Sequence, residues 1–293
     1  MGKLFRPAAQ PPLAVKRAFF ICILFAAGCR IPDWVEIKNL YRVTRYLSAA
    51  RFDKEFDLRR QQAINAVDKK LSAAAQARWV ALQTAVWDFT SFHQSFYEVT
   101  LDQGETDIWT KPFEFLESKT GQKLARSLDI YYAQGYVLWR DYKEQDIPPR
   151  RRQLIEELYF TGFDLGLEED IARLISPLLT EAEYKVKYGR AADAEDEDFK
   201  ELSEKNLRKE LQRVRKLDRT RALDKNELRD MAIRLSLLTE EDIAAVIREQ
   251  AKPENTDMGH IERIAIAESM AFQIEDFLAE SPAAKPGKAE FTE

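Results

Sequence analysis

The chain has 293 residues, with 50 acidic and 45 basic side chains and a formal net charge of −5 at pH 7. This acidic balance argues against a general nucleic-acid-binding protein, which would carry an excess of Lys and Arg. The chain holds only two histidines, so a His-rich metal site is excluded. Its length is enough to bury a substantial core, in one large domain or two smaller ones.

The first 28 residues have the layout of a secretory signal peptide. Basic residues, the last of them Arg17, precede an uninterrupted apolar run from Ala18 to Gly28, and no acidic residue occurs before Asp33. The run is about half the roughly 20 residues that a helix needs to cross a bilayer. A permanent membrane span is therefore not expected here.

The exit from this run, Ala26-Ala27-Gly28-Cys29, resembles the lipobox of bacterial lipoproteins. In that class the peptide is cut before the cysteine, whose sulfur and new amino group then receive acyl chains, so the resemblance implies a lipid anchor on Cys29. It covers only about the first 30 residues, and Ala26 stands where leucine is usual. Arg30 follows in place of the aspartate of inner-membrane lipoproteins, which implies the periplasmic face of the outer membrane. An ordinary signal peptide, a short uncleaved anchor and a transit peptide stay open as alternatives.

Removal of residues 1–28 would change the formal charge from −5 to −9, with 41 basic residues against 50 acidic. Cys22 would leave with the signal peptide and Cys29 would be acylated. No thiol would then remain for a disulfide, a metal site or a nucleophile. We accordingly expect no cofactor and no metal ion.

The rest of the chain predicts an all-α fold, a multi-helix bundle of long amphipathic helices without a substantial sheet. A first helix is expected over 33–51. Because no Gly or Pro occurs between residues 52 and 103, one long helix or two nearly continuous helices are expected over 52–100, with a break near Ser72. We expect an N-terminal helical unit over 29–145, a C-terminal unit over 150–280 and a disordered tail over 281–293.

Two apolar stripes with alternating spacings of three and four residues are expected to pair as an antiparallel helical unit. The first consists of Trp79, Leu82, Val86, Phe89, His93 and Phe96. The second consists of Leu124, Leu128, Tyr131, Gly135, Leu138 and Tyr142.

The C-terminal unit begins after Pro148-Pro149, which stop any preceding helix. Pro177 is expected to end or bend one of its helices. An acidic segment from Asp193 superficially resembles a calcium loop, but Asp198 stands where that loop needs glycine, so a solvated linker is expected. Helices are expected over 153–187 (two, separated near 162–166), 199–221, 224–238, 239–250 and 260–278, with a loop over 253–259.

Three features are candidates for a functional role. His93, on the first stripe, is either a hydrogen-bonded core histidine or a ligand-binding residue. The aromatic residues between 79 and 163 either pack a core or surround a pocket for an apolar ligand. Glu268-Ser269 resembles the glutamate-serine pair of lytic transglycosylases, which implies that Glu268 acts as general acid and base on peptidoglycan. That chemistry needs a protonated Glu268 in an apolar cleft.

The glycine-rich segment that follows this pair in that family is absent, and the same dipeptide recurs at 117–118 and 280–281. We therefore assign no catalytic residue and do not favour an enzyme. The sequence predicts an envelope lipoprotein, anchored to the membrane through Cys29, that acts as a binding or scaffold component with envelope protein partners. A carrier of apolar ligands and a peptidoglycan-cleaving enzyme using Glu268 are the two alternatives. The oligomeric state stays open.

Overall fold

The computed structural model describes residues 34–102, 110–141, 147–190 and 197–279. By its internal contacts the chain divides into residues 1–41 and 42–293. Within the first unit only residues 34–41 are described, the N-terminal part of helix α2 (Trp34–Ala49). The predictions for the signal peptide, for Cys29, for the linker around Asp193 and for the tail lie outside the described residues.

The all-α prediction is confirmed, because every regular element in the described ranges is a helix. Several helices begin at residues whose side chains bind the free backbone N–H groups of the first turn. Thr239 and Asp242 form the reciprocal capping box that their spacing predicts. The helices after α2 are α3 (Phe52–Asn65), α4 (Ala73–Val86), α5 (Phe89–Asp102), α6 (Thr110–Glu117), α7 (Lys119–Asp141), α8 (Pro149–Phe160), α9 (Leu165–Tyr188), α10 (Glu197–Thr220), α11 (Lys225–Arg234), α12 (Glu240–Gln250) and α13 (Pro253–Ala279).

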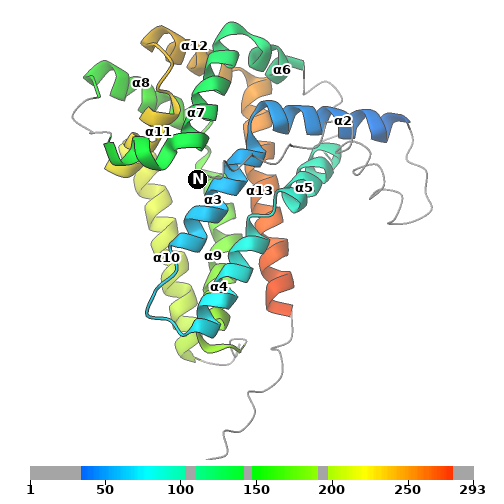
Figure 1. Ribbon diagram of the computed structural model, residues 1–293, viewed down its shortest axis with the longest axis vertical. Helices are drawn as coiled ribbons and strands as arrows, with labels where there is room; N and C mark the ends of the chain where they lie inside the picture. The colour runs from blue at the N-terminus through cyan, green and yellow to red at the C-terminus, as the bar shows by residue number, and fades with distance from the viewer. Residues whose placement is uncertain (1–33, 103–109, 142–146, 191–196, 280–293) are drawn as a thin grey trace, which may run out of the picture. The chain divides into compact units, whose positions relative to one another are not determined.

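Helix α13 is the centre of the second unit. It packs against α4, α5, α6, α9 and α12, and the long helix α10 packs against α9. Helices α6, α7, α8, α11 and α12 gather at the upper end in Figure 1. Buried Ala265, Ala267 and Ala271 leave room for close neighbours along α13. Buried Lys185 of α9 holds the end of this helix by donating to the carbonyls of Phe277 and Leu278, at 2.5 and 3.0 Å.

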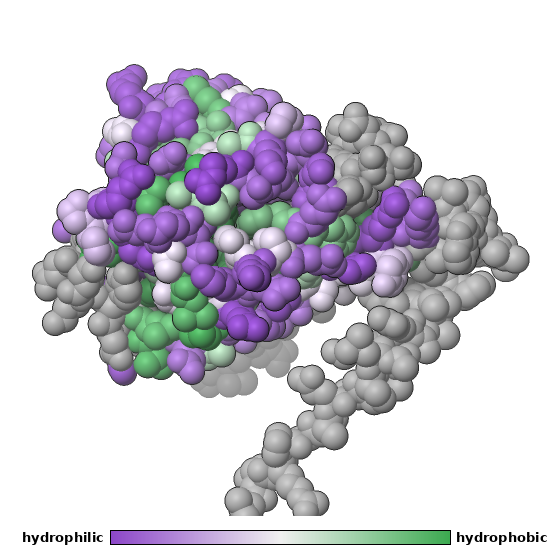
Figure 2. Space-filling view, turned by 90° about the horizontal axis from the view of Figure 1, so that it is seen from above, coloured by the Kyte–Doolittle hydropathy of each residue, from purple (hydrophilic) through white to green (hydrophobic). Residues whose placement is uncertain are grey.

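The surface at that upper end is mostly hydrophilic, with hydrophobic patches between the charged residues (Figure 2). No helix in the described part of the chain is both long enough and apolar enough to span a bilayer.

The prediction of one or two helices over 52–100 is wrong, because three helices, α3, α4 and α5, lie there. The expected break near Ser72 is present, and the Ser72 hydroxyl accepts from the backbone N–H of Ala75 at 3.2 Å. A second break falls at Trp87 and Asp88. There the Asp88 carboxylate accepts from the backbone N–H of Ser91 at 2.9 Å and starts α5. This local cap ends the helix although the apolar spacing continues through it.

The expected pairing of the two apolar stripes is also wrong. Helix α5 lies along α13, while α4 packs against α3, α9 and α13. Helix α7, which carries the second stripe, packs mainly against α6 and α11. Spacing shows that a helix has an apolar face, but several amphipathic helices in this chain can cover such a face, and spacing does not choose among them.

The position of Pro253 differs from expectation, and one of the two effects expected of Pro177, the end of a helix, does not occur. The predicted loop over 253–259 forms the first turns of α13, because Pro253 occupies a helix start, where no backbone N–H is needed. The side chains of Asn255 and Thr256 secure this start by donating to the carbonyls of Glu249 and Gln250, at 2.8 and 3.0 Å. Pro177 does not end α9, which continues through it to Tyr188.

Candidate functional site

A cavity of about 500 Å³ lies among the helices of the second unit. This volume is within the range of small-molecule sites in proteins. Its apolar wall includes Phe52, Phe56, Trp87, Pro112, Phe115, Leu116, Leu124, Leu128 and Ile266. Its polar wall includes Tyr46, Glu55, Arg59, Tyr132, Thr161, Arg234, Gln250, Asn255, Thr256, Glu262 and Arg263.

Helix spacing places these side chains at the cavity. Glu55 and Arg59 lie one turn apart on α3, and Gly259, Glu262 and Ile266 lie at intervals of three and four residues on one face of α13. Gly259 leaves space, because a Cβ atom added there would meet no atom within 4 Å. Gly121 has the opposite role: an added Cβ would overlap the Phe115 carbonyl oxygen, so only glycine lets α7 approach α6 this closely.

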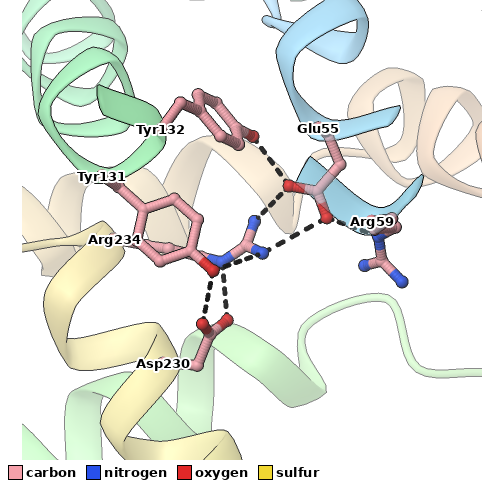
Figure 3. Close-up of polar contacts among 6 residues, drawn as sticks. All are labelled: Glu55, Arg59, Tyr131, Tyr132, Asp230 and Arg234. Carbon is pink, nitrogen blue, oxygen red and sulfur yellow. Dashed lines mark hydrogen bonds and ion pairs between the residues drawn. The ribbon is translucent and has the colours of Figure 1, made fainter. Parts of the chain in front are cut away.

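One side of the cavity is a polar network that joins α3, α7 and α11 (Figure 3). Arg234 binds Glu55 through both terminal nitrogens, at 2.9 and 3.2 Å, and its Nε donates to Asp230 at 2.7 Å. The Tyr131 hydroxyl donates to Asp230 at 2.5 Å and the Tyr132 hydroxyl to Glu55 at 2.9 Å. The side chains of Glu55 and Arg234 are only 12% and 19% exposed, so this ion pair is largely removed from solvent.

The network holds Glu55 as a carboxylate. Burial alone would raise the pKa of Glu55, but the positive charges and hydrogen bonds of Arg234 and Arg59 outweigh it and lower the pKa to about 2. Burial raises the pKa values of Tyr131 and Tyr132, so both hydroxyls stay protonated as donors. Because Glu55 is occupied by two arginines and a tyrosine, we assign it a structural role.

Glu262 of α13 is a different kind of carboxyl group. The Tyr46 hydroxyl donates to its Oε1 at 2.5 Å, and burial raises its pKa to about 7, against the opposing effects of that hydrogen bond and of Arg263. Arg263 itself is paired with Glu168 at 3.0 Å. Within the described ranges no Lys or Arg forms an ion pair with Glu262. Glu262 is half-buried and lines the cavity.

His93 is a buried core residue, as one of its two interpretations predicts. Its Nε2 lies 3.0 Å from the Thr44 hydroxyl. Its ring centroid lies 6.2 Å from that of Phe89, in an edge-to-face arrangement. Burial lowers its pKa, which favours the neutral ring. Of the aromatic residues between 79 and 163, Phe92 and Phe96 are buried in the core, and Trp87 and Phe115 line the cavity.

Glu268, the residue singled out by the glutamate-serine pair, is exposed on α13 and does not line the cavity. It therefore lacks the apolar surroundings that a protonated catalytic acid needs. Glu262 lies six residues earlier on the same helix and has those surroundings. Nothing in its sequence context distinguished it, because its environment is built by residues far away along the chain.

In the part of the chain that the structure describes, no three His, Cys, Asp or Glu side chains come together as a group that could hold a metal ion. No family model, no curated protein and no solved structure matches the chain.

Proposed function

We propose that this chain is a bacterial envelope lipoprotein, anchored through Cys29, whose helical body binds a small ligand in the cavity. The observation that carries the binding role is an interhelical cavity of about 500 Å³ with both an apolar and a polar wall. Such a lining suits a molecule with an apolar body and a polar end. Of the roles expected from the sequence, the cavity therefore favours that of a ligand carrier.

The exposed apolar residues favour a scaffold role as a second function. Phe272 on α13 is 63% exposed, and Val137 on α7 is 49% exposed. Exposed apolar side chains of this size are the kind that protein partners cover at an interface. A scaffold would recover defined envelope proteins on crosslinking and would carry no small molecule.

Two substitutions at Gly259 test the ligand-binding role. Gly259→Phe is expected to fill the cavity and remove small molecules that copurify with the chain, whereas Gly259→Ala should retain them. Both replace a helical glycine, which is expected to stabilise α13 by up to about 1 kcal/mol, so a loss specific to Phe would not reflect unfolding. The measurement is mass spectrometry of solvent extracts, with the melting temperature of each variant as a control. Identical extracts from the wild-type chain and Gly259→Phe would sink the proposal.

The anchor has its own test. We expect the wild-type chain to fractionate with the outer membrane and to release a Cys29 peptide that carries acyl chains. Cys29→Ser should abolish the acylation and leave the chain uncleaved or released from that membrane. An unmodified Cys29 in the membrane fraction would count against the lipoprotein assignment and would leave the cavity unaffected.

A further inference from the structure

In the described part of the chain, the arginines on the cavity wall form ion pairs, but Glu262 does not. Each arginine on the wall is already paired with a carboxylate: Arg59 with Glu55, Arg234 with Glu55 and Asp230, and Arg263 with Glu168. Glu262 has the Tyr46 hydroxyl as a hydrogen-bond donor but no cationic partner among the residues that the structure describes. When Glu262 ionises, the cavity therefore holds one carboxylate whose charge the protein does not balance.

A buried charge without an oppositely charged partner costs free energy. A ligand that supplies this partner removes the cost and therefore binds more tightly. The complementary group is a protonated amine. The rings of Phe52 and Phe56 on the cavity wall favour the same choice, since aromatic faces attract cations and also accept an apolar body. The volume is far larger than an ammonium ion needs, so the cation should belong to an organic molecule.

We propose that the cavity binds an amphipathic organic amine, with its ammonium group on the Glu262 carboxylate and its apolar part against the aromatic wall. This inference rests on the proposed ligand-binding function and adds the chemical class of the ligand. An anionic ligand would face Glu262, while each arginine on the wall is already paired with a carboxylate. A purely apolar ligand would leave the ionised Glu262 without a cationic partner among the described residues.

Binding should be coupled to the ionisation of Glu262. The other charged or titratable groups on the cavity wall are Glu55 and Arg59 from α3, Tyr46 from α2, Tyr132 from α7, Arg234 from α11 and Arg263 from α13. Glu55 stays ionised, and the raised pKa values of Tyr46 and Tyr132 keep those hydroxyls protonated, so Glu262 is the wall residue that titrates near neutrality. An alkylamine remains protonated until about pH 10.

The test compares three probes with one carbon skeleton, 4-phenylbutylamine, 4-phenylbutanol and 4-phenylbutyrate, on the full chain freed of small molecules. With a pKa of about 7, about a tenth of Glu262 is ionised at pH 6 and about nine tenths at pH 8. The dissociation constant of the amine should therefore fall about tenfold between these pH values. Titration calorimetry in two buffers of different ionisation enthalpy should also show a proton released on binding below pH 7.

Glu262→Gln should weaken amine binding at pH 8 by at least about tenfold, as expected for loss of a hydrogen bond to a charged group, and should remove its pH dependence. Glu275→Gln, an exposed carboxylate on the same helix, is the matched control and should behave like the wild-type chain. Proton release is measured on the wild type, so the test does not depend on any variant folding. Equal or tighter binding of the alcohol or the carboxylate, or failure of all three probes to bind, would overturn the amine assignment. The proposed function itself has a different test. It would be overturned if the wild-type chain carried no copurified molecule that Gly259→Phe loses.

Discussion

Arg234→Leu is expected to lower the free energy of unfolding by about 3–5 kcal/mol, the usual cost of removing one partner from a buried ion pair. The substitution leaves the 12% exposed Glu55 carboxylate without its bidentate partner. Asp230 also loses the hydrogen bond from the Arg234 Nε, and the Tyr131 hydroxyl loses the hydrogen bond that it accepts from Arg234. Denaturant unfolding of wild type and variant at pH 7 measures the difference.

Arg213→Leu is the matched control for this prediction. Arg213 pairs with Glu210 on α10, but the side chains are 53% and 37% exposed, so its loss should cost less than about 1 kcal/mol. The double variant Glu55→Leu with Arg234→Leu should regain much of the lost stability, because no unpaired charge is then buried. If Arg234→Leu costs no more than Arg213→Leu, the network does not join α3 to α11 as described.

Glu262→Gln is expected to make the ligand-free chain more stable than wild type at pH 8 and equally stable near pH 4.5. The pKa of Glu262 is raised from 4.5 to about 7 by burial. The folded chain thus binds more protons than the unfolded chain between these values, and its stability falls as the pH rises through 7. A shift of this size corresponds to about 3 kcal/mol. The neutral amide oxygen still accepts from Tyr46 but does not titrate.

The difference between the two chains, measured by denaturant unfolding at several pH values, isolates Glu262. His93 contributes in the opposite direction, because its pKa is lowered by burial and its contribution is lost as the pH falls. That contribution is the same in both chains and cancels. If the difference in the free energy of unfolding between wild type and Glu262→Gln stays constant from pH 4.5 to pH 8, the pKa of Glu262 is not raised by burial.

Local signals in the sequence predicted much of the fold. The capping pair at Thr239 and Asp242 and the helix start at Ser72 depend on residues three positions apart, and both are present. The sequence of α10 is charged on most faces, and of its residues only Val214 is buried. The start of α13 was missed because proline is tolerated in a first helical turn as well as in a loop.

The cavity could not be predicted because its parts come together only through the packing of helices. Glu55 and Arg234 are 179 residues apart, and Tyr46 and Glu262 are 216 apart. Glu262 is one of 50 acidic residues, and its distinct behaviour comes from burial beside Tyr46 and from the absence of a cationic partner in the described structure. Glu268 drew notice because of a two-residue pattern, which carries no information about burial.

Native mass spectrometry of the chain, extracted gently from its own membrane, tests the central claim most directly. We expect a polypeptide that begins at Cys29, carries acyl chains and sheds a further small cationic molecule when activated in the gas phase. The Gly259→Phe chain should show the same processed polypeptide without that molecule. A processed wild-type chain that sheds nothing would contradict the ligand-binding role, and an unprocessed chain that begins at Met1 would contradict the anchor.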